Sequence, residues 1–452
     1  LKRDVQAEYF AATPPLESLR FLLSLQRSGV KHFGVKLKIS FIDVRRAHWT
    51  AKVHRLLYVK LPPERWAHGK CAKLLRSMYG TKDAAQNWEL EISGFFIEHG
   101  FHPGLSSPVL YFHPIRLVWV SVHGDDITSV AEQAQLEWLY QALLTRYELK
   151  YEGMMGPDKE DLKVATVLNR LICFNEGETT YEADPRHAEI LIRELECTDA
   201  KPVTSPGVNL PLGDDKALGY DDTKRYRSLA MRAAYLSMDR PDILFASKEL
   251  ARDMQSPDTR SWAKLKRLVK YLVGKPRLVW TFPDQEWPGQ LSMYTDSDDG
   301  GCVRTRKSTS CGFLFFGVHL IEAYRSTQHT ISLSSGESEF YAGVKASSSV
   351  LGAKALTEDY GLQLEAELCL DATAAKSMLA RRGHGKAKHI ARSYLWVQQR
   401  LTDKAFKLRK VGTEENPADV GTKNLDGVKL QYLCEKCGLR YEDERHSKAL
   451  RA

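Results

Sequence analysis

The chain has 452 residues, of which 43% are hydrophobic and 27% are charged. This length exceeds what one hydrophobic core usually serves, so we expect a globular protein with two to four domains. No apolar run reaches the roughly 18 residues needed to cross a bilayer, which argues against a membrane protein. Lys and Arg outnumber Asp and Glu by 65 to 57, and this mild excess suits a polyanionic partner without requiring one.

The eight cysteines are spread thinly along the chain. Cys434 and Cys437 form the one close pair, with no second pair and no suitable His doublet, so we expect mostly buried, reduced thiols rather than a zinc site. Reduced thiols indicate a cytoplasmic or nuclear protein. The charged start at Leu1 resembles neither a signal peptide nor a transit peptide, and we expect a fragment or a processed piece.

The first third of the chain predicts a strand, a helix, a hairpin and a second helix. Residues 36–44 form an apolar run that ends beside a carboxylate, and residues 81–100 have helical spacing closed by a glycine. Residues 117–130 predict two strands joined by a tight turn with two adjacent Asp residues. The apolar stripe over residues 136–147 predicts the second helix. This order is typical of a polymerase palm, built as a split βαβ, ferredoxin-like sheet.

Residues 151–288 are more basic, and we expect them to be mainly helical. The Pro- and Gly-rich residues 201–213 predict a linker. Apolar and cationic residues alternate at helical spacing over residues 260–273. This pattern fits either a solvated amphipathic helix or a helix whose basic face contacts the phosphates of a nucleic acid. The local pattern by itself favours the solvated helix.

The last part of the chain predicts three strands, then alternating helices and strands. This succession describes the ribonuclease H fold, a mixed α/β architecture. The expected elements are strands at 291–296, 312–317 and 330–335, a long helix at 336–360, strands at 366–371 and 406–411 separated by two helical stretches, and a short helix near Pro417.

Seven carboxylates stand where a metal-dependent enzyme would need them. Phosphoryl transfer by two divalent cations about 3.5–4 Å apart requires clustered carboxylate oxygens, and strand ends are suitable places for them. Any one acid at a strand end is more often a turn residue or a helix cap, but their joint placement favours metal sites. The acids are Asp43, Asp125 and Asp126 in the first part of the chain, and Asp296, Glu339, Asp371 and Asp419 in the last.

A series of short motifs runs in order through the chain, and with them the chain resembles the copia-type (Pseudoviridae) retrotransposon polyproteins over residues 9–424. The motifs are YFAATPP at 9–15, FIDVRRA at 41–47, SMYGTKDA at 77–84, HGDD at 123–126, YRSL at 226–229, RPDI at 240–243, YTDSD at 294–298, RKST at 306–309, SSGESEF at 334–340, KHI at 388–390 and PAD at 417–419.

The resemblance implies an RNA-directed DNA polymerase, or reverse transcriptase, joined to a ribonuclease H. The expected metal ligands and catalytic residues are the seven acids, with Glu339 rather than Glu337 as the ligand from the long helix. The implied cofactor is Mg²⁺, with Mn²⁺ as the alternative. The implied partners are an RNA template, a DNA primer, an RNA/DNA hybrid and dNTPs, without a membrane, in a cytoplasmic virus-like particle or the nucleus. Residues expected to bind substrate are His48, Gly80, Lys82, Lys266 and Arg267.

The fold expected from these features is multidomain, α/β and α+β. We place truncated polymerase fingers and the palm in residues 1–150, a helical thumb or connection in 151–288, and a ribonuclease H-like domain in 289–426. Residues 427–452 form a tail in which no motif can be interpreted. The sequence leaves the oligomeric state open.

The chain departs from the family pattern at its polymerase motifs. His48 stands where the family has a Phe that excludes the ribose 2′-OH, and His123 and Gly124 replace the Tyr and Val of its YVDD box. The family's basic ARLVA segment is not found ahead of these motifs. These departures motivate a rival interpretation, a decayed or co-opted nucleic-acid-binding remnant, and a third, weaker one is an unrelated metal-dependent nuclease with a structural palm-like half.

Overall fold

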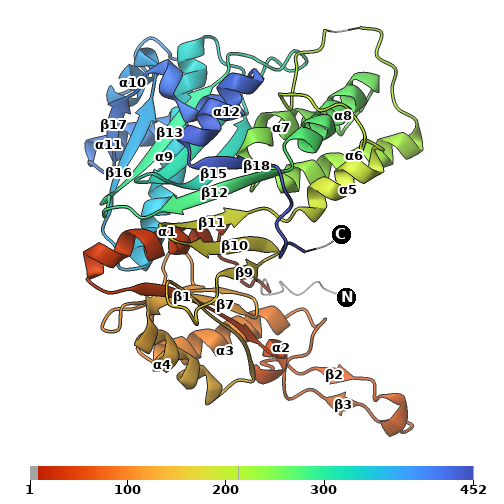
Figure 1. The fold of residues 1–452 in the computed structure, drawn as a ribbon, viewed down its shortest axis with the longest axis vertical. Helices are drawn as coiled ribbons and strands as arrows, with labels where there is room; N and C mark the ends of the chain where they lie inside the picture. The colour runs from red at the N-terminus through yellow and green to blue at the C-terminus, as the bar shows by residue number, and fades with distance from the viewer. Residues whose placement is uncertain (1–8, 212, 451–452) are drawn as a thin grey trace. The chain divides into compact units, whose positions relative to one another are not determined.

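The computed structural model describes residues 9–211 and 213–450, and the chain divides into two compact units (Figure 1). The first unit is Leu1–Leu162 together with Ala355–Gln363, and the second is Lys163–Lys354 together with Leu364–Ala452. The expectation of a mixed α/β, multidomain protein is confirmed, whereas the functional domain boundaries at 150, 288 and 426 stay predictions. No helix in the described ranges is long and apolar enough to cross a membrane.

The first unit is built on a six-stranded sheet with the order β4-β5-β6-β7-β1-β8. Strand β1 lies between β7 and the edge strand β8 and pairs antiparallel with both. Apolar side chains of α3 and α4 pack with those of the central strands in one core. The elements are α1 (Leu16–Phe33), β1 (Leu37–Val44), α2 (Ala47–Thr50), β2 (Tyr58–Val59), η1 (Pro63–Arg65), β3 (Ala72–Lys73), α3 (Ala84–Glu98), β4 (His102–Pro103), β5 (Leu110–His113), β6 (Val118–His123), β7 (Asp126–Glu132), α4 (Gln133–Leu144) and β8 (Leu149–Met155).

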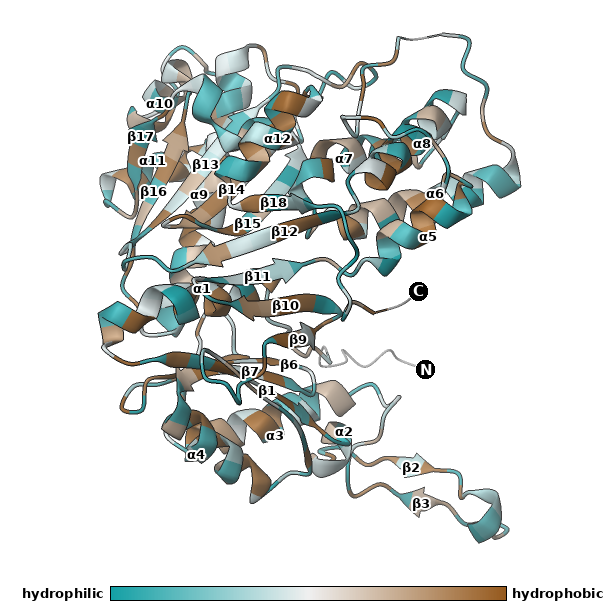
Figure 2. Ribbon diagram, in the orientation of Figure 1, coloured by the Kyte–Doolittle hydropathy of each residue, from teal (hydrophilic) through white to brown (hydrophobic). Residues whose placement is uncertain are grey.

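The predicted strand, helix, hairpin and helix of this unit are confirmed as β1, α3, the β6–β7 hairpin and α4. Strand β6 is buried along nearly all of its length. Figure 2 shows the hydropathy of its residues and of the strands around it. Burial of such continuous apolar strands under two helices is the main stabilising contribution expected for this unit.

The second unit contains two five-stranded sheets, with the orders β18-β12-β11-β10-β9 and β15-β14-β13-β16-β17. Helices α5 to α8 pack against one another, and the long helix α9 begins in this unit. The elements are β9 (Val164–Val167), β10 (Arg170–Asn175), β11 (Glu178–Glu182), α5 (Arg186–Glu194), α6 (Tyr220–Leu236), η2 (Pro241–Ile243), α7 (Leu244–Asp253), α8 (Thr259–Gly274), β12 (Arg277–Pro283), β13 (Gln290–Ser297), β14 (Thr309–Phe316), β15 (His319–Thr327), α9 (Ser335–Asp359), β16 (Glu365–Leu370), α10 (Thr373–Ala380), η3 (Arg392–Leu395), α11 (Trp396–Thr402), β17 (Lys407–Lys410), η4 (Thr413–Glu415), η5 (Pro417–Gly421), α12 (Gly427–Lys436) and β18 (Leu439–Glu442).

In the second of these sheets, β13, β14 and β15 are antiparallel neighbours, and β16 and β17 then join parallel to β13. Three antiparallel strands followed by alternating helices and parallel strands is the order that the sequence predicted. The long helix, the strands at 366–371 and 406–411, and the short helix near Pro417 are likewise present as α9, β16, β17 and η5.

Two expectations about secondary structure are wrong. Residues 151–288 are not mainly helical, because they contain the strands β9 to β12 as well as α5 to α8. The hairpin of β10 and β11 turns at Gly177, which has a positive φ of 78°, and this Glu-Gly turn between two β-rich runs was the signal for it. The residues after 426, in which the sequence showed no motif, contain α12 and β18, and β18 pairs with β12.

Residues 330–335 are not the third strand, which is β15 instead. The alternation of Thr, Ile, Ser and Leu imitates a strand, but Ile331 and Leu333 are more than half exposed. Ser334 accepts a hydrogen bond from the N–H of Glu337 through its hydroxyl oxygen, at 3.3 Å. The segment is therefore the approach to the N-terminus of α9.

Candidate active sites

Three carboxylates meet at the end of β1 and the β6–β7 hairpin. Asp43 lies directly opposite Asp126 in the antiparallel register of β1 and β7, so both side chains are on the same face of the sheet. Asp125 is in the two-residue hairpin turn, and its carbonyl oxygen accepts a hydrogen bond from the N–H of Val44 at 2.9 Å. The structure therefore brings together the three acids that the sequence singled out in this unit.

A side chain of α3 fixes the hairpin turn beside these acids. The indole N–H of Trp88, a buried residue, donates a hydrogen bond to the carbonyl oxygen of Gly124 at 2.7 Å. Gly124 has a φ of 64°, a conformation that suits the first central position of a tight hairpin turn. Trp88 thus fixes the turn that holds Asp125 and leads into Asp126.

The electrostatics of this cluster favour a cation. Burial, followed by repulsion from Asp125, Asp43 and Glu152, raises the pKa of Asp126 to about 6, and Lys150 opposes the shift only weakly. Burial and the neighbouring carboxylates disfavour the charged form of Asp126, so a bound cation would stabilise it. The group fits divalent metals by its donor set, although its oxygen atoms are not drawn together as closely as those of the second cluster.

The three expected substrate residues near this cluster have different surroundings. The ring of His48 stacks on Tyr79 with centroids 4.3 Å apart, and its Nδ1 is enclosed without a hydrogen-bond partner. Burial lowers the pKa of His48, although the nearby Asp125 opposes the shift. Gly80 has a φ of 90° and open space where a Cβ would lie, while the Lys82 side chain is exposed.

A second cluster joins Asp296, Glu339 and Asp371. Each of them offers a carboxylate oxygen, and these oxygen atoms all lie within 4.8 Å of one another. Asp296 lies near the end of β13, Asp371 directly follows β16, and Glu339 comes from the second turn of α9. Because β13 and β16 are adjacent and parallel, their carboxyl ends meet at one edge of the sheet.

The fourth predicted acid, Asp419, lies next to this cluster but faces two lysines. Its carboxylate is buried and is 2.7 Å from Nζ of Lys423 and 3.4 Å from Nζ of Lys429. The charge of Asp419 helps to raise the pKa of Asp296. Asp296 also accepts a hydrogen bond from the Thr422 hydroxyl. Asp419 is therefore a neighbour of the three clustered acids rather than a member of the tight group in this structure.

Glu337 and Glu339, two residues apart, have separate surroundings. Glu337 accepts hydrogen bonds from the Leu333 N–H at 3.1 Å and the Tyr341 hydroxyl at 2.9 Å, and it lies 2.9 Å from His389 Nε2. Glu339 instead points to the acidic cluster, where its Oε2 is buried without a hydrogen-bond partner. This geometry agrees with the expectation that Glu339, rather than Glu337, faces the other acids.

The second cluster also fits a divalent cation. Burial and then repulsion from Asp296 and Asp371 raise the pKa of Glu339, and burial also raises the pKa of Asp296, next to Asp419 and Asp371. Three hard oxygen donors with an unpartnered buried oxygen and strong mutual repulsion are the donor chemistry that Mg²⁺ or Mn²⁺ would require.

We expect Mg²⁺ to raise the melting temperature more at pH 8.5 than at pH 5.5. Without metal, the raised pKa values make deprotonation of Asp296 and Glu339 unfavourable in the folded state, so this site loses stability as pH rises above the pKa of an ordinary carboxyl. Bound metal needs the deprotonated carboxylates, so its stabilising effect grows over the same window. Thermal unfolding with and without Mg²⁺ at the two pH values measures this. An equal shift at both pH values, or a shift of the same size in Asp371→Asn as in the wild type, would contradict it.

The basic helix α8 carries the other two predicted substrate residues. Lys266 is exposed, whereas Arg267 is half-buried and donates a hydrogen bond from Nη2 to the Ser205 hydroxyl at 2.9 Å. Arg267 therefore ties α8 to the linker, a structural role that the sequence did not suggest. The RPDI motif is also structural, because Arg240 and Asp242 form a buried two-pronged ion pair at 2.9 and 2.7 Å.

Comparisons with known proteins agree with the resemblance found in the sequence. Residues 4–167 match the family described as reverse transcriptase (RNA-dependent DNA polymerase). The chain is 25% identical over 450 residues to the retrovirus-related Pol polyprotein from transposon TNT 1-94 of Nicotiana tabacum, an alignment that covers 96% of this chain and 33% of that one. It is also 25% identical over 408 residues to the Pol polyprotein from transposon RE2 of Arabidopsis thaliana, covering 88% of this chain and 27% of the relative.

The chain thus spans a third or less of the length of these curated relatives. Among solved structures, it is similar to the foamy viral protease-reverse transcriptase in complex with an RNA/DNA hybrid, with a TM-score of 0.53 and 12% identity, over 89% of this chain and 46% of that chain. This likeness concerns the fold alone. The resemblance is therefore confirmed: the chain carries a match to the reverse transcriptase family and is related over most of its length to retrovirus-related Pol polyproteins of copia-type transposons.

Proposed function

We propose that this chain is an RNA-directed DNA polymerase with ribonuclease H activity, derived from a retrotransposon Pol polyprotein. The observation that carries the proposal is the presence of one carboxylate cluster in each unit, Asp43 with Asp125 and Asp126, and Asp296 with Glu339 and Asp371. The reverse transcriptase family match covers the first cluster. The second cluster stands on a sheet whose strand order is the one expected for a ribonuclease H.

The finer domain assignment belongs to the same proposal. Residues 1–150 would form the palm with truncated fingers, residues 151–288 the thumb or connection, and residues 289–426 the ribonuclease H-like domain. The observed strands β9 to β12 give the middle segment a sheet as well as helices, which favours a connection over a purely helical thumb. The residues after 426 would then extend that connection through β18.

The polymerase site would hold two Mg²⁺ ions on Asp43, Asp125 and Asp126. Bound there, they would supply positive charge that stabilises the negative charge developing on the attacking 3′-oxygen and on the leaving pyrophosphate. The protein's own contribution is to hold three carboxylates on a rigid hairpin, which Trp88 fixes through the carbonyl of Gly124. His48 and its stacking partner Tyr79 would contact the sugar of the incoming dNTP, next to an RNA template and a DNA primer.

The nuclease site would bind the RNA strand of an RNA/DNA hybrid beside Asp296, Glu339 and Asp371. Mg²⁺, or Mn²⁺ in its place, would activate a water molecule and neutralise the charge that develops on the phosphate. Asp419, with Lys423 and Lys429 at its carboxylate, would position the Asp296 side of the site through Thr422. Location in a cytoplasmic virus-like particle or in the nucleus stays a prediction.

Paired assays on one preparation test the proposal. We expect Mg²⁺-dependent primer extension on an RNA template and Mg²⁺-dependent cleavage of an RNA/DNA hybrid. Asp125→Asn should remove extension alone, and Asp371→Asn should remove cleavage alone, because the two acids belong to different clusters. Loss of both activities in each variant would argue against two independent sites.

The substitutions at His48, His123 and Gly124 favour a second candidate, a nucleic-acid-binding remnant without turnover. In that case, neither activity appears in well-folded protein, and salt-sensitive binding of the hybrid persists. Hybrid cleavage without extension would instead assign the loss to the polymerase site alone.

His48→Phe should increase the preference for dNTPs over rNTPs by about tenfold, because a larger apolar ring beside the sugar leaves less room for a 2′-OH and offers it no hydrogen bond. The stack on Tyr79 should survive, since Phe keeps an aromatic face. Single-nucleotide incorporation kinetics with matched dNTP and rNTP measure the ratio. An unchanged ratio would mean that His48 does not contact the sugar.

A further inference from the structure

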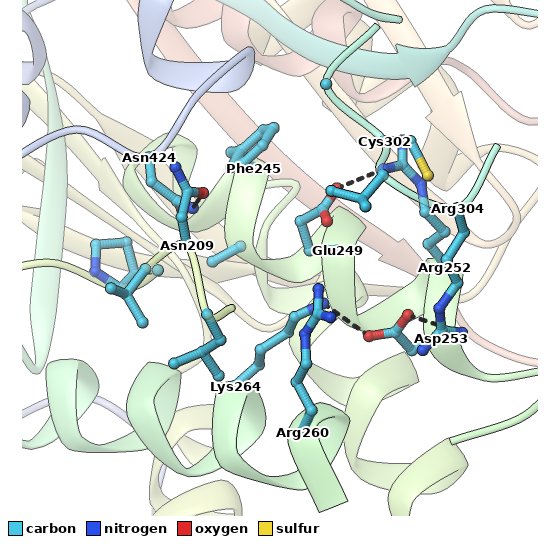
Figure 3. Close-up of a pocket in the computed structure, with 17 residues that line it drawn as sticks. Asn209, Phe245, Glu249, Arg252, Asp253, Arg260, Lys264, Cys302, Arg304 and Asn424 are labelled. Atoms are coloured by element: carbon cyan, nitrogen blue, oxygen red, sulfur yellow. Dashed lines mark hydrogen bonds and ion pairs between the residues drawn. The ribbon is translucent and has the colours of Figure 1, made fainter. Parts of the chain in front are cut away.

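A cavity of about 300 Å³ in the second unit is lined by residues of α7, α8, the linker and the loop that follows β13 (Figure 3). None of the seven candidate catalytic acids lines it. Its volume is at the lower end of the range for pockets that bind small molecules. Four cationic side chains contribute to its wall, namely Arg252, Arg260, Lys264 and Arg304.

Three of these four cations have a carboxylate partner. Arg252 forms an ion pair with Glu249 at 2.9 Å. Glu249 forms a second ion pair with the buried Lys248, also at 2.9 Å. Lys264 pairs with Asp253 at 2.9 Å.

Arg304 pairs with Asp258 at 2.9 Å and lies 3.5 Å from Asp253. The carboxylates at this cavity are therefore fully engaged by the other cations.

Arg260 is the cation without such a partner. Within the described part of the chain, Arg260 forms no ion pair, and its Nε is enclosed without a hydrogen-bond acceptor. It attracts Asp258 only at longer range. Arg260 and Lys264 are four residues apart on α8, so they share one face of the helix, and both extend toward Asp253 in Figure 3.

We propose that this cavity binds the phosphate group of a phosphate ester, with Arg260 as its principal ligand. A planar guanidinium with unused donors, beside a lysine and a second arginine, can donate several hydrogen bonds to the acceptor oxygens of a phosphate group. A half-buried, unpaired arginine is unfavourable in the free protein, and a bound dianion would supply the missing counter-charge.

The other walls fit an ester better than a bare ion. Asn209 and Asn424 are hydrogen-bonded to each other at 2.7 Å and keep further amide donors and acceptors for an organic group. The ligand is therefore a nucleotide-sized phosphate ester, and the phosphate belongs either to a free mononucleotide or to a nucleic-acid strand.

Calorimetric titration of the full chain with adenosine 5′-monophosphate, inorganic phosphate and a short single-stranded oligonucleotide tests this inference. The titrations contain EDTA, so that the carboxylate clusters hold no metal and bind no nucleotide through it. We expect one site for the monophosphate, and Arg260→Gln should weaken it at least about tenfold. Arg193→Gln, which removes a largely exposed arginine from α5, is the matched control and should bind as the wild type does.

Two further results decide between binding and folding. Because Arg260 has no ion pair to lose, Arg260→Gln should leave the melting temperature unchanged or raise it. Val208→Trp, which fills the cavity from the linker side, should also abolish binding of the monophosphate. A loss of oligonucleotide binding in both variants would identify a strand phosphate, and a loss confined to the monophosphate would identify a free nucleotide. No binding by the wild type, or equal binding by Arg260→Gln, would overturn the inference whatever the two catalytic assays show.

Discussion

Glu339→Gln is expected to slow cleavage of an RNA/DNA hybrid by at least about 10³-fold, whereas Glu337→Gln should stay within about tenfold of the wild type. The first value corresponds to a loss of about 4 kcal/mol of transition-state stabilisation, the size expected when a metal ligand is removed. Single-turnover cleavage at saturating Mg²⁺ measures both rates.

The contrast rests on what the two carboxylates contact. Glu339 contributes an oxygen atom to the group within 4.8 Å, together with Asp296 and Asp371. Glu337 turns away from that group and holds the approach to α9 through Leu333 and Tyr341. Glu337→Gln removes charge-assisted hydrogen bonds and should therefore lower stability by about 1–3 kcal/mol while leaving the metal ligands in place.

The stability of the two variants should change in opposite directions. Repulsion and burial make the Glu339 carboxylate unfavourable in metal-free protein, so Glu339→Gln should unfold at the same or a higher temperature when EDTA is present. Glu337→Gln should unfold at a lower temperature. If Glu337→Gln, rather than Glu339→Gln, lost cleavage, the assignment of the metal ligand would be wrong.

The parts of the fold that the sequence predicted well are those with strong local patterns. Apolar runs on both sides of Gly124 predict the β6–β7 hairpin. The helix α9 is 25 residues long, and its length made it easy to predict. The acids could be placed because each stands at a strand end or in a helix start, where the topology decides which side chains meet. The convergence of Asp43 with Asp126 follows directly from the β1–β7 register.

The parts that could not be predicted depend on distant partners. Strand β18 is short, and only pairing with β12 makes it a strand. The lysines at Asp419 and the unpaired Arg260 are ordinary surface-type residues in the sequence, and only the folded chain shows that one cation is left without a carboxylate. Residues 330–335 were wrongly predicted as a strand. A Ser-rich segment that precedes a helix can alternate polar and apolar residues as a strand does.

Tyr360→Ala should destabilise the first unit by about 3–5 kcal/mol, the range for deletion of a large buried aromatic side chain. Tyr360 is fully buried in that unit, although it lies almost 200 residues beyond Leu162 in the sequence. Its ring stacks on Phe21 with centroids 6.2 Å apart, and its carbonyl oxygen accepts a hydrogen bond from the indole N–H of Trp119 at 3.0 Å. Removal of the ring leaves a cavity that α1 and β6 cannot close.

The residues beside Tyr360 strengthen the same attachment. The Asp359 carboxylate accepts hydrogen bonds from the backbone N–H groups of Leu105, Ser106 and Ser107 at 2.7, 3.0 and 3.0 Å. Gly361 has a φ of 71°, and a Cβ there would lie 2.4 Å from the Phe112 ring. Residues 355–363 are thus a tightly fitted part of the unit that carries Asp43, Asp125 and Asp126.

Hydrogen exchange of peptides from β5 and β6 measures the effect locally, which matters because two units need not unfold together. Tyr58→Ala, which removes an exposed tyrosine of the same unit, is the control and should change exchange little. For a unit of this size, the loss corresponds to a decrease of about 2–4 °C in its melting temperature per kcal/mol. Primer extension should then fail at a lower temperature in Tyr360→Ala than in Tyr58→Ala. Exchange in β5 and β6 that matches the wild type would show that the first unit does not depend on residues 355–363.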